Sequence, residues 1–218
     1  MERNSTAIVT GVSRGLGRAI AEALTAEGWT VVGDGRTLTG EPKHGLVPVP
    51  GDVTDSWHRA LLVETALETG RLDLLVNNAG ILGPSPQPAL ADYPLDALRD
   101  VLEVNLVAPL ALTQLALPAL REHGGAVVNV SSDAAVAAYP GWGGYGAAKA
   151  AVEQFSNVLA AEEPKVRVWW ADPGDLRTQM HAEAFPGEDI SDRPLPETVT
   201  PALLELLRRR PESGRVRL

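Results

Sequence analysis

The stretch Thr6-Ala-Ile-Val-Thr-Gly-Val-Ser-Arg-Gly-Leu-Gly17 decides the fold, because a short apolar run leads directly into a glycine-rich turn. Apolar residues at helical spacing follow it and predict a helix from about 18 to 27, with Gly28 as its stop. Residues 29–32 form a second run that is typical of a strand. This order of strand, turn, helix and strand predicts the opening of an α/β fold built on a parallel sheet.

The glycines of the turn, Gly11, Gly15 and Gly17, have the spacing G-x-x-x-G-x-G. Glycine permits a tight turn and lets the backbone approach a pyrophosphate above the positive end of the following helix. The segment is therefore typical of a dinucleotide-binding βαβ unit. An ordinary glycine-rich turn is the alternative, and the flanking strand and helix favour the nucleotide-binding interpretation.

Strands and helices alternate through the rest of the chain, with strand-type runs at 46–49, 73–77, 125–130 and 165–171. Helices are predicted at 56–69, 95–120 and 145–162, and Pro109 is expected to bend or restart the second of them. The alternation predicts one domain over residues 1–218: a single Rossmann-like, doubly wound parallel sheet with helices on both faces.

The C-terminal part of the chain is less regular. Residues 175–197 are rich in Pro, Gly and charge, and are interpreted either as a substrate lid or as a disordered surface loop. Three of their side chains would give such a lid a partly apolar lining: Met180, His181 and Phe185. Residues 214–218 resemble a last strand only faintly, whereas Trp169-Trp170 is predicted to pack in the core.

The composition excludes several classes of function. The 218 residues include 19 basic and 28 acidic side chains, and the net charge of −9 disfavours binding to nucleic acid or to an anionic membrane. With no cysteine, disulfides, thiolate catalysis and cysteine-based metal sites are ruled out. No metal site is expected, because the histidines lack ligand spacing and are each predicted to lie on the surface: His44, His58, His123 and His181.

Two further features bear on localisation. Residues 1–6 are polar and lack the basic and apolar regions of a signal peptide, which favours a cytoplasmic protein. The apolar stretch 101–120 is interrupted by Glu103, Asn105, Thr113 and Gln114. It is therefore interpreted as a buried helix and not as a membrane span.

Tyr145-Gly-Ala-Ala-Lys149 carries the candidate chemistry. Residues four apart on a helix lie roughly 5–6 Å apart at Cβ, so Lys149 is expected to lower the pKa of Tyr145 from about 10. A phenol tuned in this way can donate or accept a proton near neutral pH. The pentapeptide alone favours the alternative, a half-exposed helix that carries a surface lysine, so the case for chemistry depends on the residues around it.

The whole set of motifs resembles the short-chain dehydrogenase/reductase family, in its single-domain branch. The resemblance spans nearly the whole chain and rests on Thr10-Gly11-x-x-x-Gly15-x-Gly17, Asp52-Val53, Asn77-Asn78-Ala79-Gly80, Asn105, Ser132, Tyr145-x-x-x-Lys149 and Pro173-Gly174 with Thr178. The 13-residue step from Ser132 to Tyr145 is the usual one in the family, and it selects Ser132 over Ser131.

The resemblance implies a catalytic role for four residues. Tyr145 would be the general acid/base at the substrate oxygen, and Ser132 would hydrogen-bond the same oxygen. Lys149 would lower the pKa of Tyr145 and hold the nicotinamide ribose, while Asn105 would support a water-linked proton path to Lys149. Alternatives are that Ser132 caps a turn, that Asn105 satisfies buried backbone groups and that Asn77-Asn78 forms a turn.

The resemblance also implies a set of cofactor-binding residues along the cleft. It consists of Gly11, Ser13, Arg14, Gly15, Leu16, Gly17, Arg36, Asp52, Val53, Asn78, Ala79, Gly80, Tyr145, Lys149, Pro173, Gly174 and Thr178.

The choice of cofactor depends on the end of the second strand. The family position that carries an NAD-selecting aspartate falls on Gly35 and is followed by Arg36, and Arg14 precedes the second glycine of the turn. Two arginines favour a 2′-phosphate, so NADP(H) is predicted over NAD(H). Asp34 lies one residue away and keeps NAD(H) open as the alternative.

The predicted activity is an NADP(H)-dependent interconversion of a small carbonyl compound and a secondary alcohol by hydride transfer. A catalytically idle NAD(P)-binding regulatory protein and a sugar-nucleotide epimerase or dehydratase are the alternatives. The family's usual dimer contact would use helices 95–120 and 145–162, which predicts a homodimer or, through the last strand, a homotetramer.

Overall fold

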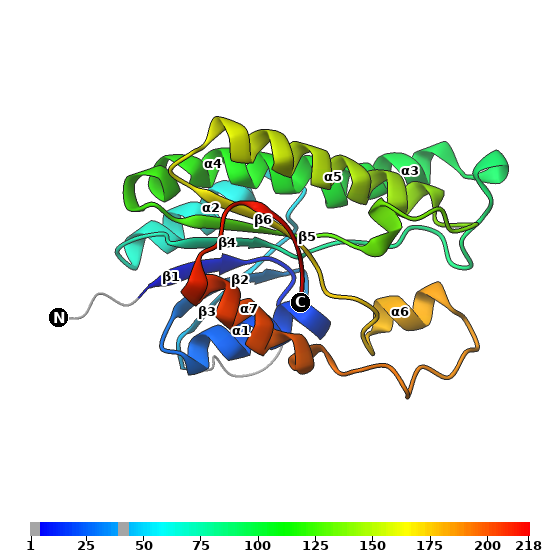
Figure 1. Ribbon diagram of the computed structural model, residues 1–218, viewed down its shortest axis with the longest axis horizontal. Helices are drawn as coiled ribbons and strands as arrows, with labels where there is room; N and C mark the ends of the chain where they lie inside the picture. Colours follow the sequence, from blue (N-terminus) through cyan, green and yellow to red (C-terminus); the bar gives the residue numbers. More distant parts are fainter. Residues whose placement is uncertain (1–4, 39–43) are drawn as a thin grey trace.

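A computed structural model describes residues 5–38 and 44–218 of the chain, so the predicted polar amino terminus falls mostly on residues 1–4, outside the described residues. Seven strands form one parallel sheet with the order β3-β2-β1-β4-β5-β6-β7 (Figure 1). The strands are β1 (Thr6–Val9), β2 (Thr30–Gly35), β3 (Leu46–Pro50), β4 (Leu74–Asn77), β5 (Ala126–Val130), β6 (Arg167–Asp172) and β7 (Gly214–Arg217).

Helices connect the strands. The α-helices are α1 (Gly15–Ala26), α2 (Ser56–Glu68), α3 (Leu95–Leu102), α4 (Ala108–His123), α5 (Gly143–Glu162), α6 (Gln179–Ala184) and α7 (Thr200–Arg209). Short 3-10 segments are η1 (Leu90–Asp92), η3 (Asp133–Ala135) and η4 (Pro196–Val199), and η2 (Glu103–Val107) is a π-helical turn.

Successive residues of a strand point to opposite faces of the sheet and pack into two separate hydrophobic cores, one on each face. In β1, Ala7 and Val9 pack with α1 and α7, while Ile8 between them packs on the opposite face with α2 and α4. Figure 1 shows α1 and α7 on one side of the sheet and α2, α4 and α5 on the other. The prediction of a Rossmann-like α/β fold is confirmed.

The first βαβ unit differs in its boundaries from the sequence-based expectation. The helix begins at Gly15, three residues before the predicted start, because Gly11 and Gly15 take φ values of +75° and +57° and complete the turn within four residues. Strand β2 continues past the predicted end, since its residues 31–35 pair with 46–50 of β3. Gly33 and Asp34 are therefore inside the strand and not in a loop after it.

The predicted long helix over 95–120 is interrupted by the π-turn η2. The amide of Ala108 bonds to the carbonyl of Glu103, five residues earlier. Pro109 has no backbone N–H, so the regular bond to the carbonyl of Asn105 cannot form. The expected restart at Pro109 is confirmed, and its physical form is a wider turn that contains Asn105.

The stretch Leu95–His123 is long and apolar enough to cross a membrane, with a mean hydropathy of 1.5 over its most apolar window. In the fold, Leu112, Ala116 and Leu120 of α4 are at most 1% exposed and pack with the sheet and with α2. The interpretation as a packed helix agrees with this placement.

The C-terminal segment has regular structure, which the interpretation of residues 175–197 as a disordered surface loop did not predict. Residues 175–197 contain α6 and the first two residues of η4, so the interpretation as a disordered loop is wrong. Residues 214–217 pair in parallel with β6 and complete the sheet, although the sequence resembles a strand only faintly. Of the predicted core pair, Trp169 is fully buried, whereas Trp170 is only half-buried.

The prediction that every histidine lies on the surface is wrong for His58, which is 6% exposed. Its ring contacts Asp34, and a side-chain Cβ at Gly51 would collide with it. His181 is half-buried, and its ring packs 4.8 Å from that of Phe185. The contact of His58 with Asp34 has no signal in the local sequence, because it joins segments that only the tertiary fold brings together. His181 and Phe185 are four residues apart at α6, so their contact is local.

Candidate active site

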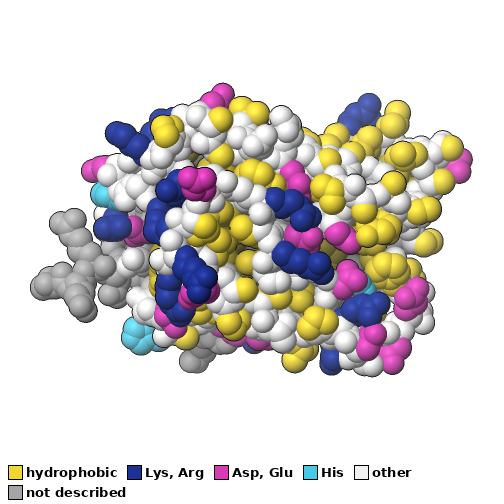
Figure 2. Space-filling model, viewed as in Figure 1, with side chains coloured by type: hydrophobic (Ala, Val, Ile, Leu, Met, Phe, Trp, Pro, Cys, Tyr) yellow, Lys and Arg dark blue, Asp and Glu magenta, His cyan; other side chains and the backbone are white. Residues whose placement is uncertain are grey.

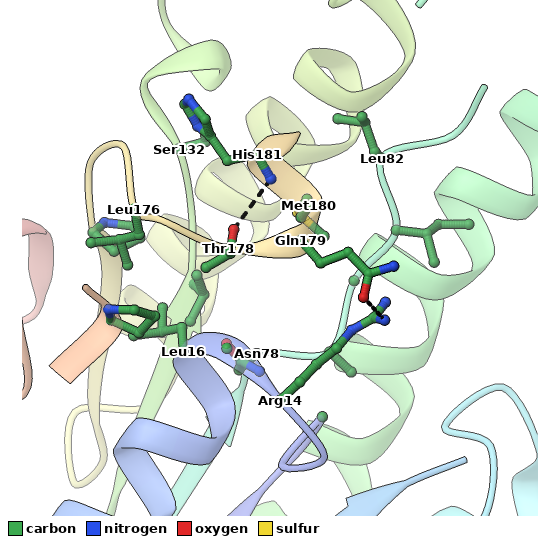
Figure 3. A pocket seen from close by; sticks show the side chains of 18 of the residues that line it. Arg14, Leu16, Asn78, Leu82, Ser132, Leu176, Thr178, Gln179, Met180 and His181 are labelled. Carbon is green, nitrogen blue, oxygen red and sulfur yellow. Dashed lines mark hydrogen bonds between the residues drawn. The ribbon is translucent and has the colours of Figure 1, made fainter. Parts of the chain in front are cut away.

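A cleft of about 1130 Å³ opens at the carboxyl ends of the strands, where parallel α/β sheets bind their ligands. Of the predicted site residues, all but Gly17 and Asn105 line it. Figure 3 shows Arg14, Leu16 and Asn78 at one side of this cleft, Ser132 and Leu82 at the other, and α6 residues between them. The tertiary structure thus brings together residues that are 165 positions apart in the chain, such as Arg14 and Gln179.

The glycine turn is closely packed from below. A Cβ on Gly17 would collide with the carbonyl oxygen of Gly11 and with Nδ2 of Asn78. The Asn78 side chain donates a 2.8 Å hydrogen bond to the carbonyl of Thr10, which holds the turn after β4 against the turn after β1. No described side chain caps α1 at Arg14, so the positive end of the helix faces the cleft. These features fit the pyrophosphate of a dinucleotide.

Asp34 has a different place from the one considered in the sequence. Its carboxylate accepts a 2.6 Å hydrogen bond from the Gly11 amide and lies 3.3 Å from Nε2 of His58. Burial raises the pKa of Asp34, against the lowering effect of these two partners. The next residue, Gly35, presents no side chain, and Arg36 is exposed at the edge of the cleft.

Asp52 and Val53 line the cleft beyond Arg36. The carboxylate of Asp52 accepts hydrogen bonds from the amide and hydroxyl of Thr54, at 2.9 and 2.8 Å. The hydrogen bond from the backbone amide of Thr54 is the main cause that lowers the pKa of Asp52. Asp52 is therefore a fixed, ionised acceptor at this end of the cleft.

Tyr145 and Lys149 lie together on α5, and both are buried. The Lys149 ammonium donates a 2.8 Å hydrogen bond to the carbonyl of Val130 at the end of β5. Its Nζ lies 5.5 Å from the centre of the Tyr145 ring. The interpretation as a half-exposed helix with a surface lysine is therefore wrong.

The two groups have strongly shifted pKa values. Burial raises the pKa of the Tyr145 phenol above its usual range, and the carboxylates of Asp133 and Asp172 raise it further. Burial lowers the pKa of Lys149 to about 8. The net shift of the Tyr145 pKa is therefore upward, because desolvation of the phenol and two nearby negative charges act in that direction. A lowering contribution of Lys149 to this pKa stays a prediction.

Ser132 lies at the carboxyl end of β5 and lines the same cleft. Its hydroxyl accepts a 3.2 Å hydrogen bond from the Ala134 amide, so it does cap the turn η3. It also donates a 3.2 Å hydrogen bond to Oδ1 of Asp133. Ser132 is therefore held in a fixed orientation at the cleft wall.

Asn105 lies behind the cleft and does not line it. Its side chain accepts a 2.8 Å hydrogen bond from the amide of Ile81 and donates one of 2.8 Å to the carbonyl of the same residue. The alternative role, satisfying buried backbone groups, is the one that the geometry displays. Asn77 is also buried, and its amide nitrogen donates to Asn129 at 2.7 Å, which joins β4 to β5.

Sequence reasoning missed several residues that surround Tyr145. Asp133 directly follows Ser132, and Trp142 lies three positions before Tyr145 with its ring 5.8 Å from the phenol ring. Asp172 ends β6, and Arg215 of β7 donates a 2.9 Å hydrogen bond to its Oδ2. Adjacency to the predicted serine and tyrosine was the available signal for Asp133 and Trp142, whereas the Arg215 contact depends on a strand that the sequence barely indicated.

The segment 175–197 lies against the cleft. Arg14 of the glycine turn donates a hydrogen bond to the side chain of Gln179, and the amide of His181 donates to Thr178 at 3.2 Å (Figure 3). Ser85, in the loop after β4, donates to the carbonyl of Glu183 at 2.6 Å. The helix α6 therefore bridges the loops after β1 and β4.

The parallel sheet and the cleft at its carboxyl ends define a Rossmann-like α/β protein, and comparison with known proteins makes the assignment more specific. The family model for short chain dehydrogenases matches residues 5–189. The short chain dehydrogenase asqE of Emericella nidulans is 39% identical over 173 residues, which cover 72% of this chain and 64% of that protein.

Solved structures agree with this match. A short-chain dehydrogenase from Streptomyces avermitilis superposes with a TM-score of 0.86 at 32% identity, covering 100% of this chain and 88% of that one. A short chain dehydrogenase from Shigella flexneri, complexed with NADP, gives a TM-score of 0.87 at 30% identity, over 99% and 97% of the two chains. The chain belongs to the short chain dehydrogenase family of oxidoreductases.

Proposed function

We propose that the protein interconverts a small carbonyl compound and a secondary alcohol, with Tyr145 as the general acid/base. The observation that carries the proposal is the convergence of Ser132, Tyr145 and Lys149 on one cleft whose other end is the glycine turn. A nicotinamide bound over that turn would supply or accept the hydride. Tyr145 would move the proton at the substrate oxygen, and Ser132 would orient that oxygen.

Lys149 would act on Tyr145 through its charge. Its pKa of about 8 leaves the ammonium protonated at neutral pH, close to the phenol ring. The hydrogen bond from Lys149 to the carbonyl of Val130 holds this charge in a fixed position. Asn105 would support this arrangement indirectly, by holding Ile81 beside the cleft.

NADP(H) is the coenzyme that we propose, with NAD(H) as the less favoured one. Asp34 is engaged by Gly11 and His58, Gly35 offers no carboxylate, and Arg14 and Arg36 both line the cleft. This arrangement supports a site for a 2′-phosphate. Among similar structures, the Shigella flexneri protein is complexed with NADP, and a reductase from Brucella melitensis is complexed with NADH.

We further propose that the protein is a cytoplasmic homo-oligomer that acts on small molecules. Residues 175–197 would be its substrate lid, because α6 already contacts the glycine turn and the loop after β4. Residues 1–218 would form one catalytic domain around the single sheet.

The test is Tyr145→Phe, which removes the phenolic proton and keeps the ring. We expect turnover of carbonyl substrates with NADPH to fall by at least about a thousandfold, while coenzyme affinity changes by less than about threefold. Coenzyme absorbance measures turnover, and calorimetric titration measures affinity. Retained turnover would refute the acid/base role, whereas an inactive parent protein that binds coenzyme would support the regulatory alternative.

A further inference from the structure

Three carboxylates line the part of the cleft formed by the ends of β5 and β6. They differ in whether a positively charged side chain lies beside them. Asp172 is 2.9 Å from the guanidinium of Arg215, and Asp175 is 3.9 Å from Nδ1 of His181. Across residues 5–38 and 44–218, no Lys, Arg or His lies within 4.0 Å of the Asp133 carboxylate. Because His181 is charged only if protonated, Asp133 and Asp175 both lack a permanent positive partner, and Asp133 is the one held next to Ser132.

The Asp133 side chain is held in place by two hydroxyl groups. Ser132 donates to its Oδ1 at 3.2 Å, and Tyr139 donates to its Oδ2 at 2.9 Å. A carboxylate has roughly four acceptor positions, so about two remain for a ligand. Because the side chain is already oriented, little further ordering is needed when a ligand binds.

The contact with Ser132 defines where a ligand group would meet Asp133. If Ser132 turns its hydroxyl hydrogen from Asp133 to the reacting oxygen, Asp133 Oδ1 stays 3.2 Å from Ser132 Oγ and lies within about 6 Å of that oxygen. A hydroxyl on the carbon next to the reacting carbon fits this interval and can donate to the carboxylate. A carboxylate in place of that carbon would meet the like charge of Asp133, which is exposed, so solvent screens part of the repulsion.

The rest of this region is apolar. The Trp142 ring lies 5.8 Å from both the Tyr145 and the Phe185 ring, and Leu82, Met180 and Ala184 line the cleft beside it. Hydrophobic side chains are also most numerous at this end of the molecule, which carries α3 and α6, on the right in Figure 2. An aryl or other apolar substrate body fits such walls.

We propose that Asp133 selects α-hydroxy ketones and the vicinal diols into which they are reduced, and rejects α-keto acids. This inference rests on the proposed function and names its substrate class. A hydroxyl is the donor that we assign, because the two groups that already donate to Asp133 are hydroxyls, those of Ser132 and Tyr139. Asp133 is then a residue that determines specificity and is separate from the serine, tyrosine and lysine that handle the proton.

The experiment compares kcat/KM with NADPH for two matched pairs of substrates. The first pair is 2-hydroxyacetophenone and propiophenone, which exchange a hydroxyl for a methyl group. The second is methyl benzoylformate and benzoylformate, which exchange a neutral ester for a carboxylate. Ratios within one variant cancel any loss of folded enzyme, so a variant that folds poorly still gives a result.

In the parent enzyme, we expect the hydroxy ketone and the ester each to be preferred by about tenfold or more. Asp133→Ala should bring both ratios close to one. Asp133→Asn, which keeps an acceptor oxygen without the charge, should abolish the discrimination against benzoylformate and retain part of the hydroxyl preference. Asp96→Asn is the matched control, because Asp96 lies outside the cleft and pairs with Arg99 on α3, and both ratios should stay unchanged.

If the enzyme reduces these ketones but the two kcat/KM ratios are the same in the parent and in Asp133→Ala, the assignment of Asp133 is overturned and the proposed function stands. Failure of the parent enzyme to turn over any of the four compounds with either coenzyme would count against the proposed function and the inference together. The two failures are therefore distinguishable.

Discussion

At the scale of single residues, Lys149 shows that the site is built at a cost in stability. Its pKa falls from 10.5 to about 8 because the ammonium is buried. Between these values the unfolded chain binds more protons than the folded one, so this contribution makes stability rise as the pH rises. The destabilisation is fully present below about pH 8 and declines toward pH 10.5.

Lys149→Met should therefore stabilise the protein while it removes activity. At pH 7 we expect the free energy of unfolding to rise by up to about 3 kcal/mol, because an apolar side chain replaces a desolvated ammonium. At pH 9.5 the gain should be less than half as large. Denaturant titrations at the two pH values measure it, and a variant that is less stable than the parent at pH 7 would contradict the argument.

Arg36 is the residue on which the coenzyme preference is expected to depend. Arg36→Ala should lower kcat/KM with NADPH by about tenfold to a hundredfold and leave that with NADH nearly unchanged, since it removes a charge-assisted hydrogen bond to phosphate. Arg18→Ala is the control, because Arg18 also lines the cleft but pairs with Glu22 at 3.1 Å on α1. A parent enzyme that prefers NADH, or an equal effect on both coenzymes, would overturn the proposal.

At the scale of secondary-structure elements, β7 connects the end of the chain to the site. Arg215 donates to Glu153 of α5 and to Asp172 of β6, both at 2.9 Å, and lies 3.4 Å from the carbonyl of Ser132. The Asp172 carboxylate raises the pKa of Tyr145, so the positive charge of Arg215 opposes that effect. The last strand thus positions two loops of the site and compensates one of its charges.

Arg215→Gln should raise the pKa of Tyr145, because Asp172 loses its cationic partner. Alcohol oxidation needs the phenolate as base, so the rising limb of its pH–rate profile should move to higher pH. Adding Asp172→Asn removes the negative charge and should move the limb back. The profile of kcat/KM against pH measures both steps, and a shift that persists in the double variant would indicate only a loss of packing.

At the scale of the whole molecule, the outer faces of α4 and α5 carry apolar side chains that remain exposed among the described residues. Leu110 of α4 is 37% exposed and Val158 of α5 is 44% exposed, as is Val107 at the end of η2, while Ala147 and Ala150 are exposed on α5. Small and apolar residues on adjacent helices permit close approach of a second copy. This surface supports the proposed oligomer.

Sedimentation equilibrium should give a mass of two or four times 23.1 kDa for the parent protein. Leu110→Arg should shift the population toward single chains, because a buried unpaired charge opposes association. Trp57→Arg on α2 is the control, since Trp57 is 84% exposed and lies outside the proposed contact. A parent protein that sediments as a single chain would rule the oligomer out.

The sequence by itself determined the class of fold and the members of the cleft. Strand alternation, helical periodicity and the spacing of Gly11, Gly15 and Gly17 are local signals, since each depends on neighbours within a few residues. The family resemblance added Ser132, Tyr145 and Lys149, and all three line the cleft with the predicted cofactor residues except Gly17. The interrupted helix at Pro109 follows equally from the missing N–H of proline.

Only the tertiary structure decided the electrostatics of the site. Asp34 is turned toward His58, the pKa of Tyr145 is raised instead of lowered, and Arg215 reaches Asp172 from the last strand. Burial and the distances between charges determine these properties, and both are set by segments far apart in the chain. A linear motif specifies which groups meet, whereas the desolvation and the field that they experience exist only once the chain has packed.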